Sequence, residues 1–190
     1  MELVFATNNL HKIKEVSPLI KNSFHLLCLS DLNFNEDIPE TQPTIEGNAS
    51  QKSHFIYDKF ALNCFADDTG LEIEALAGEP GVFSARYAGE GCNFQDNIDK
   101  VLMKLEGVNN RNARFRTVIS LILEGKEHLF EGIVKGKILT EKHGNDGFGY
   151  DPIFMPDGFG ISFAEMSLEE KNKVSHRAIA TKKLAEFLNT

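Results

Sequence analysis

The chain has 190 residues, of which 42% are hydrophobic and 25% are charged, as is typical of one soluble globular domain, with or without two lobes. Its formal net charge of -8 argues against a broad basic surface for nucleic acid, and no apolar run is long enough for a signal peptide or a membrane span. The three cysteines are an odd number without CxxC spacing, which favours free thiols in a reducing compartment, so we expect a cytoplasmic protein.

The N-terminal segment predicts a buried strand that leads through a polar turn into a helix. Residues 3–6 are apolar, Thr7–Asn9 supply helix-capping side chains, and Pro18 ends or kinks the helix. Free backbone N–H groups at such a turn bind anions, and Lys12 adds a charge one turn into the helix. An ordinary capped surface helix with a solvated lysine is the simpler interpretation of this segment alone. Residues 24–29 predict the next strand, and hence a first βαβ unit.

The following segment predicts a loop and then a helix. Residues 31–44 are polar and contain two prolines, so we expect a loop whose Asp37 and Glu40 are free to reach a shared site. After Thr44, the expected N-cap, apolar residues recur at near-helical spacing. Lys52 lies about two turns into this helix.

Residues 65–76 are the stretch in which we expect the chemistry. The stretch opens as a short apolar run, breaks at the four residues Asp67–Gly70, and resumes as an alternating strand with a solvated acidic face. Adjacent residues of an extended strand point to opposite faces, so Asp67 and Asp68 are not expected to share one role. Two carboxylates and a hydroxyl at a strand end suit a metal-and-phosphate corner. A solvated turn is the simpler interpretation of these four residues alone.

The remaining sequence predicts three helices, a hairpin, a long loop and one segment of open state. In chain order these are an open segment at 82–89, a helix capped by Asn93, hairpin strands at 114–123 and 128–139, a glycine- and aromatic-rich loop at 144–163, a short helix opened by a capping box at 167–170, and a final helix capped by Ser175. Gly132 and Gly136, inside the second hairpin strand, indicate a bulge or a close backbone contact.

Five motifs are individually weak but specific in combination. They are Thr-Asn-Asn-Leu-His-Lys at 7–12, Phe-Ala-Asp-Asp-Thr-Gly-Leu at 65–71, Pro-Gly-Val-Phe-Ser-Ala-Arg-Tyr at 80–87, Phe-Gly-Tyr-Asp-Pro at 148–152, and Ser-His-Arg-Ala at 175–178. With these motifs in this order, the chain closely resembles the inosine triphosphate pyrophosphatase family, also called XTP/dITP diphosphatases, from Met1 to the last helix.

The resemblance implies a Mg²⁺-dependent hydrolase that converts non-standard purine nucleoside triphosphates (XTP, ITP, dITP) to the monophosphate and pyrophosphate, in sanitation of the nucleotide pool. It also implies an α/β fold in which an elongated mixed sheet is flanked by helices, with two lobes and a central substrate cleft. The whole chain, 1–190, would be a single nucleoside triphosphate pyrophosphatase domain, and the protein a homodimer.

The resemblance further assigns roles to residues. Asp68 matches the catalytic base and a metal ligand, and Glu40 matches the other metal-binding carboxylate. We expect Arg177 to donate to the 6-keto oxygen of the base and Phe148 to stack on the purine. The matched substrate contacts are Thr7, Asn8, Asn9, Leu10, His11, Lys12, Lys52, Thr69, Phe148, Gly149, Tyr150, Asp151, Lys171, His176 and Arg177. One departure is Gly47, where the family more often has a second acidic residue.

Some assignments stay open on the sequence alone. Arg86 and Tyr87 are compatible with structural and with functional roles. A related septum-associated nucleotide pyrophosphatase would act on other nucleotides, but its N-terminal turn typically carries paired arginines, which this turn lacks. A nucleotide-binding regulatory protein without turnover would be favoured by loss of Glu40 or Asp68, and both are present.

Overall fold

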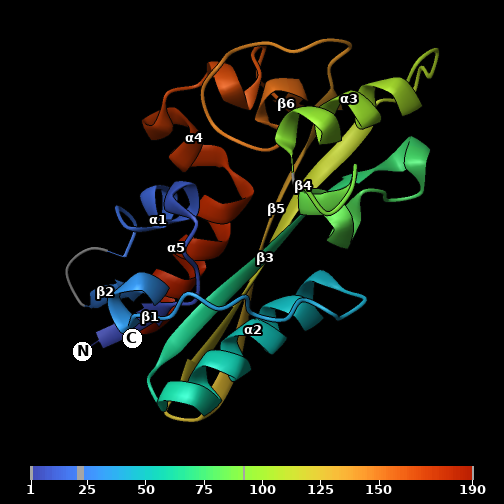
Figure 1. Ribbon diagram of the computed structural model, residues 1–190. Coiled ribbons are helices and arrows are strands. Elements are labelled where there is room, and N and C mark those ends of the chain that lie inside the picture. Colours follow the sequence, from blue (N-terminus) through green and yellow to red (C-terminus); the bar gives the residue numbers. More distant parts are fainter. Residues whose placement is uncertain (1, 21–23, 92, 190) are drawn as a thin grey trace. The chain divides into compact units, whose positions relative to one another are not determined.

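The computed structural model describes residues 2–20, 24–91 and 93–189, and within them six strands form one sheet in the order β2-β1-β3-β4-β5-β6. β1 is parallel to β2 and β3, whereas β5 and β6 are antiparallel, so the sheet is mixed. The expected α/β class, a mixed sheet flanked by helices, is confirmed (Figure 1). The strands are β1 (Glu2–Phe5), β2 (His25–Cys28), β3 (Cys64–Ile73), β4 (Asn112–Leu123), β5 (Lys126–Ile138) and β6 (Phe154–Pro156), and the α-helices are α1 (Leu10–Val16), α2 (Ile45–Phe60), α3 (Phe94–Lys104), α4 (Leu168–Val174) and α5 (His176–Leu188).

The chain divides into two compact units. The first unit comprises Met1–Asp68, Thr117–Gly132 and His176–Thr190, and the second comprises Thr69–Arg116 and Ile133–Ser175. β3, β4 and β5 each contribute residues to both units. Each unit has a hydrophobic core of its own.

In the first unit the sheet is covered by helices on both faces. Successive strand residues point to opposite faces, and Leu3 and Phe5 accordingly pack with residues of α1 and α5, which lie side by side in Figure 1. Val4 and Ala6 pack in a second cluster with Ile56 of α2. The same alternation continues on β3 and β4. Both faces of these strands are buried, which explains why their sequences are continuously hydrophobic and do not alternate with polar residues.

β3 runs without interruption through Asp67–Gly70, so the predicted break there is wrong. The strand lies between β1 and β4 in the sheet, and hydrogen bonds to neighbouring strands satisfy its backbone N–H and C=O groups. This pairing outweighs the local preference of Asp and Gly for turns. Pairing with β1 is recorded at Cys64 and Phe65 only. Asp67 and Asp68 therefore lie immediately beyond the point where β1 leaves the sheet and the chain turns into α1.

The hairpin prediction is confirmed with slightly longer strands, since β4 and β5 begin two residues earlier than expected. Glu124 and Gly125 connect them, both with positive φ (51° and 78°), as in the tightest hairpin turns. The two strand glycines make the expected close backbone contacts. A Cβ at Gly132 would lie 2.0 Å from the carbonyl oxygen of His176, and one at Gly136 would lie 2.3 Å from that of Met155.

In the second unit, α3 and the aromatic residues of the 144–163 segment form the core with β3 and β4. That segment is not a plain loop, because it contains a 3₁₀ helix (Asp151–Ile153) and β6. The open segment forms a 3₁₀ helix (Gly81–Arg86). Tyr87 follows it, is buried, and donates a 2.6 Å hydrogen bond to Glu79, which is a structural role.

Four of the five predicted helix caps are confirmed, and the fifth, Ser175 before α5, stays a prediction. The side chains of Asn9, Thr44, Asn93 and Ser167 each accept a hydrogen bond from backbone N–H groups at the start of α1, α2, α3 and α4. These contacts satisfy donors that a helix N-terminus leaves without an intrahelical partner.

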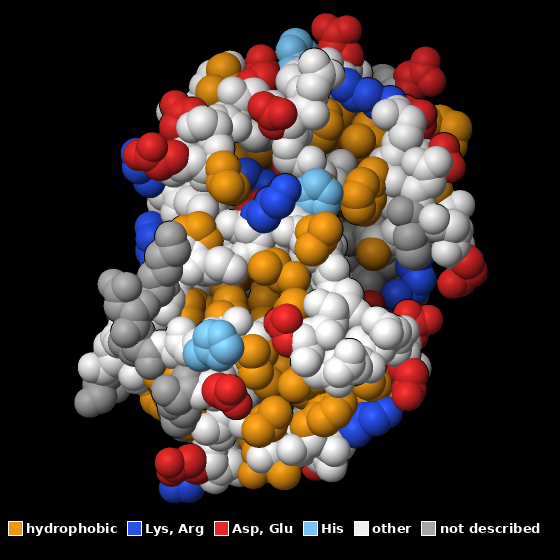
Figure 2. Space-filling view, turned by 60° about the vertical axis from the view of Figure 1, so that its left-hand side comes forward, with side chains coloured by type: hydrophobic (Ala, Val, Ile, Leu, Met, Phe, Trp, Pro, Cys, Tyr) orange, Lys and Arg blue, Asp and Glu red, His pale blue; other side chains and the backbone are white. Residues whose placement is uncertain are grey.

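Figure 2 shows Lys and Arg side chains in small groups between acidic and hydrophobic side chains on the face that it draws, with no continuous basic field among the described residues there. Among the same described residues, no helix combines the length and the hydropathy needed to cross a membrane.

Candidate active site

Asp67 and Asp68 are adjacent on β3, and the alternation of the strand separates their environments. Asp67 falls on the face covered by α1 and α5, whereas Asp68 falls on the face covered by α2. The contacts of each side chain agree with this division. The prediction that the two carboxylates do not share one role is therefore supported by their different partners.

Asp67 is the centre of a buried ionic network in the first unit. Lys12 Nζ donates to Asp67 Oδ1 at 2.7 Å, and Arg177 Nε donates to Asp67 Oδ2 at 3.0 Å. Arg177 Nη1 also donates to the carboxylate of Glu15 on α1. Burial alone would raise the pKa of Asp67, but the charges of Lys12 and Arg177 hold that pKa well below its ordinary value. Asp67 is thus an ionised anchor for two cations.

Lys12 is not the solvated surface residue that its position in the first helical turn suggests. Only 17% of its side chain is exposed. Burial lowers the pKa of its ammonium, and the positive charges of Lys52 and Arg177 add to that effect, while Asp67 opposes it. The contact with Asp67 directs the Lys12 ammonium toward β3.

Asp68 belongs to a second network, formed with α2 and the segment before it. Asn48 Nδ2 donates to Asp68 Oδ2 at 3.2 Å, and Lys52 Nζ lies 3.6 Å from Asp68 Oδ1. Lys52 also donates to Glu40. Burial raises the pKa of Asp68, and Lys52 only partly offsets this. The pKa of Lys52 is raised, because Asp68 and Glu40 outweigh the effect of its burial.

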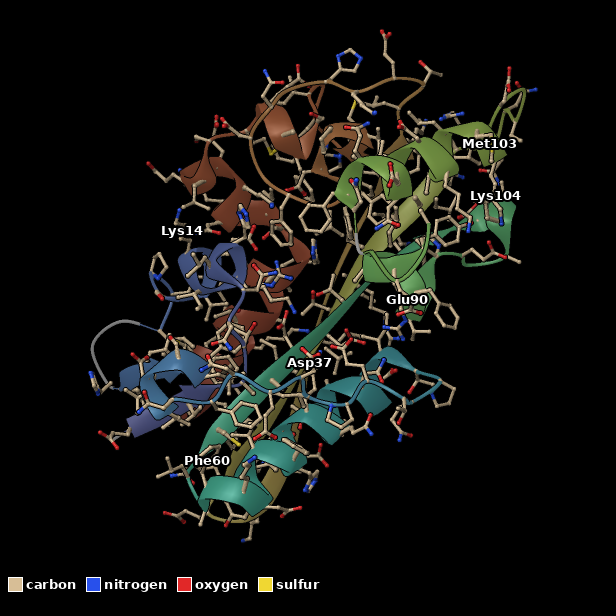
Figure 3. All side chains as sticks on the ribbon, viewed as in Figure 1. Lys14, Asp37, Phe60, Glu90, Met103 and Lys104 are labelled. Atoms are coloured by element: carbon tan, nitrogen blue, oxygen red, sulfur yellow. The ribbon has the colours of Figure 1, made fainter. Side chains whose placement is uncertain are left out.

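Asp37 precedes Glu40 on the segment that leads into α2 and carries a label in Figure 3. Its side chain is exposed, and the ionic contacts recorded for this segment at the site are those of Glu40. Of the two loop carboxylates expected to reach a shared site, Glu40 is therefore the one placed beside Lys52.

The turn between β1 and α1 is rigidly built from its own side chains. Asn9 Oδ1 accepts from the N–H groups of His11 (2.9 Å) and Lys12 (3.3 Å), and Thr7 Oγ1 accepts from that of Asn9 (3.1 Å). Asn8 Nδ2 donates to the carbonyl of Phe34 at 3.2 Å. The cap thus uses two of the helix N–H groups that an anion would otherwise meet, which leaves the Lys12 ammonium as the main cationic group of this turn.

In the second unit, Asp151 organises the segment that carries Phe148. Its Oδ2 accepts from the backbone N–H of Phe148 at 2.8 Å and from Lys171 Nζ at 2.7 Å, and both charged side chains are buried. The Lys171 ammonium lies 5.2 Å from the centre of the Phe148 ring. Gly147 has φ +78° and leaves no room for a side chain, because a Cβ would lie 2.2 Å from Asp151 Oδ2. The backbone and the ring of Phe148 are therefore held by one buried ion pair.

The other residues matched by the resemblance are distributed over both units. Leu10 and His11 are exposed at the start of α1, and His176 is buried as the first residue of α5. Thr69 is half-buried on β3. In the second unit, Gly149 has φ +62°, and the buried Tyr150 donates to the carbonyl of Ser84 at 2.8 Å.

Sequence reasoning did not single out Asn48 or Glu15, although each had a signal. The buried residues of α2 recur at helical spacing, and three of them are polar: Asn48, Lys52 four residues later, and Ser53. Glu15 is three residues from Lys12, so the two side chains project from neighbouring positions of α1. Polar residues inside an otherwise buried helical stripe indicate a site rather than a solvated face.

The net charge of the ionic groups around Asp67 and Asp68 bears on whether this site can bind a further cation. Four buried or half-buried carboxylates (Glu15, Glu40, Asp67, Asp68) face three cations (Lys12, Lys52, Arg177), which leaves a net charge of -1 when all are ionised. Glu40 and Asp68 offer the hard oxygen donors that Mg²⁺ prefers, and Mg²⁺ needs only one or two protein carboxylates when phosphate and water complete its shell. Among the described residues, no group of three or more His, Cys, Asp or Glu forms a larger metal cage. The donor set therefore fits a sparsely held Mg²⁺.

Comparison with known proteins identifies the family. The model of the Ham1 family matches residues 3–187. The dITP/XTP pyrophosphatase of Flavobacterium psychrophilum is 56% identical over 98% of both chains, and that of Christiangramia forsetii is 54% identical over 100% of both. The solved structure of the Staphylococcus aureus Ham1 protein is similar with a TM-score of 0.91 at 40% identity, covering 100% of this chain and 98% of that one. The chain belongs to the Ham1 family.

Proposed function

We propose that this protein is a nucleoside triphosphate pyrophosphatase that hydrolyses dITP, ITP and XTP to the monophosphate and pyrophosphate. The observation that carries the proposal is the arrangement of Asp68, a buried carboxylate with a raised pKa, beside Lys52 and Glu40. Relatives that are 54% and 56% identical over 100% and 98% of this chain are named dITP/XTP pyrophosphatase, which supports the proposal. We further propose that the enzyme is a cytoplasmic homodimer that helps to clear non-standard purine nucleotides.

Asp68 acts on the attacking water. A carboxylate whose pKa lies above its ordinary value is a stronger base, and it accepts a proton from water as the oxygen attacks the α-phosphorus. The bond between that phosphorus and the bridging oxygen breaks, pyrophosphate leaves, and the monophosphate retains the water oxygen. Mg²⁺ held by Glu40 and Asp68 would shield the phosphate charges and favour this displacement.

Lys12 and Lys52 position the triphosphate, which carries about four negative charges at neutral pH. The net charge of the surrounding ionic groups is -1, so these lysines do not neutralise a triphosphate while they also balance their own carboxylates. The charge balance of the site therefore requires a divalent cation for triphosphate binding, in agreement with what the resemblance implies. The turn residues Thr7–His11 and Thr69 stay predicted substrate contacts.

Base selection is proposed to rest on the segment Phe148–Asp151 with Lys171, and on His176 and Arg177. The ring of Phe148 stacks on the purine, and its fixed backbone gives the stack one orientation. The guanidinium of Arg177 is engaged with Glu15 and Asp67, which favours a positioning role for this residue. Its contact with the 6-keto oxygen remains a prediction.

The test is pyrophosphate release from dITP, ITP and XTP, compared with dATP and ATP, in the presence of Mg²⁺. A site built around donors to a keto oxygen rejects an amino group at the same position by roughly 10⁴-fold, and we expect a preference of that order in kcat/KM. Equal values for dITP and dATP would refute the assignment. Nucleotide binding without pyrophosphate release would favour the regulatory alternative, and a preference for other bases would favour the septum-associated one.

Asp68→Asn tests the role of the proposed base. Loss of a general base lowers kcat by about 10²–10⁴-fold, and the shape of the side chain is kept, so we expect an unchanged circular dichroism spectrum. Asp99→Asn is the matched control, because it makes the same chemical change at an exposed residue of α3 that pairs with Lys142. Near wild-type turnover of Asp68→Asn would remove Asp68 from the mechanism. Sedimentation equilibrium tests the dimer, which predicts twice the monomer mass.

A further inference from the structure

Asn48 is a buried residue in the first turns of α2, 1% exposed, and it connects two parts of the candidate site. Its Oδ1 accepts a 2.9 Å hydrogen bond from the backbone N–H of Gln42. Its Nδ2 donates a 3.2 Å hydrogen bond to Asp68 Oδ2. Gln42 lies two residues after Glu40, so one side chain contacts both the segment that carries Glu40 and the carboxylate of Asp68.

The chemistry of the partners fixes the orientation of the Asn48 amide. The backbone N–H of Gln42 can only donate, so it must meet the amide oxygen. The ionised carboxylate of Asp68 can only accept, so it must meet the amide nitrogen. A flipped amide would place donor against donor and acceptor against acceptor, which a buried site does not tolerate. Asn48 is therefore held in one orientation from both sides.

The segment before α2 is attached to the helix by further contacts that do not involve Asp68. Thr41 N–H donates to Gln51 Oε1, and Gln51 Nε2 donates to Thr41 Oγ1, both at 2.9 Å. Gly47 permits the approach, because a Cβ at this position would lie 2.8 Å from Gln42 Cβ. The structure thus separates two functions: Gln51 holds the segment, and Asn48 holds the segment and Asp68 together.

We propose that Asn48 is a positioning residue that sets the separation and orientation of the Glu40 and Asp68 carboxylates for a divalent cation. It acts through these carboxylates and is not itself a catalytic residue. The biological role of this arrangement rests on the proposed function. Physically, one side-chain amide holds two carboxylate ligands in place before the cation binds. Partners that orient metal ligands typically contribute 10–100-fold to metal affinity or activity.

The test uses the full-length protein and Mn²⁺ alone as the probe, with binding followed by electron paramagnetic resonance. Asn48→Leu retains the volume and removes both hydrogen bonds, and we expect Mn²⁺ affinity to fall about 10–100-fold. The amide of Gln42 should exchange its hydrogen faster by at least about 10-fold, because it loses its acceptor. Gln51→Ala is the matched control, since it loosens the same segment without contacting Asp68, and we expect its Mn²⁺ affinity to stay close to that of wild type.

A second variant and a second measurement keep the test decisive. If Asn48→Leu does not fold, Asn48→Ser replaces it, because a smaller polar residue fits the same space. In the wild-type protein, the side-chain amide signals of Asn48 should shift when Mg²⁺ alone is added. Unchanged Asn48 signals, wild-type affinity in the Asn48 variants, or an equal loss in Gln51→Ala would each overturn the inference.

Failure of the inference can be told from failure of the proposed function. Hydrolysis of dITP by a wild-type enzyme whose Asn48 variants bind Mn²⁺ normally would overturn only the role of Asn48. Weakened Mn²⁺ binding in the variants of a wild-type protein that does not hydrolyse dITP would support the role of Asn48 and overturn the proposed function.

Discussion

Replacing Arg177 by Met should destabilise the protein strongly, because Arg177 is the cation shared by two buried carboxylates. The side chains of Glu15, Asp67 and Arg177 are only 6%, 2% and 2% exposed, so water cannot replace the lost partner. Removing one member of a buried ion pair costs about 3–5 kcal/mol, because the remaining charge stays desolvated. Asp67 retains Lys12 as a charged partner, whereas Glu15 loses its hydrogen bond to the guanidinium. For a chain of this length a change of 1 kcal/mol shifts Tm by about 2–4 °C, so Tm should fall by roughly 6–20 °C.

Urea unfolding followed by far-ultraviolet circular dichroism measures this change, since the chain has no Trp to report by fluorescence. Arg114→Met is the matched control, because Arg114 pairs with Glu72 while 47% of its side chain is exposed, and such a pair contributes at most about 1 kcal/mol. The double variant Glu15→Leu/Arg177→Met should regain part of the loss, since it also removes one of the two buried carboxylates that pair with the guanidinium. An Arg177→Met variant no less stable than Arg114→Met would refute the buried network as a source of stability.

Three further predictions follow from the same contacts. Lys12→Ala should raise KM for dITP and lower the free energy of unfolding by about 1.5–3 kcal/mol, the contribution of a hydrogen bond to a charged group. A Michaelis curve measures the first effect and a urea titration the second. An unchanged stability would contradict the contact with Asp67. The folded-state pKa of Asp67 lies below the ordinary value of 3.8. The free energy of unfolding of wild type should therefore exceed that of Asp67→Asn by a full margin above about pH 5, and this margin should shrink as the pH falls through 3.8 and below. Urea titrations across this pH range measure the margin, and a margin that grows toward acid would contradict the prediction. Gly132→Ala should cost about 1–3 kcal/mol by overpacking against the carbonyl of His176, whereas Gly160→Ala, where an added Cβ meets nothing within 4 Å, should leave Tm nearly unchanged.

Local features of the fold were predictable because their causes are local. The caps Asn9, Thr44, Asn93 and Ser167 were identified from residue type and from the local pattern beside each, namely apolar spacing after Thr44 and Asn93, a capping box at Ser167 and a strand before Asn9, and each makes the expected hydrogen bond. The opposite orientation of Asp67 and Asp68 follows from strand geometry alone. The two hairpin glycines were recognised because a glycine inside a strand requires a reason.

Features that depend on distant partners were not predictable in the same way. The break expected at Asp67–Gly70 is absent, because pairing within the sheet outweighs the local turn preference of these residues. Arg177 and Asp67 are 110 residues apart, and no spacing rule relates them. Asn48 was missed because its role appears only when α2 is packed against β3, although its place in the buried stripe of α2 carried the signal.

The period of β3 explains why one strand can supply both the anchor and the reactive carboxylate of this site. Past the point where β1 leaves the sheet, consecutive residues face different helices, so two adjacent aspartates obtain opposite electrostatic environments. Asp67 meets two cations and stays ionised, which fixes Lys12 and Arg177 in place. Asp68 is buried with fewer cations near it, so its pKa rises, as a base requires. Exchanging either aspartate for asparagine therefore tests a different property: at Asp67 the stability of the ionic network, and at Asp68 the rate of the chemical step.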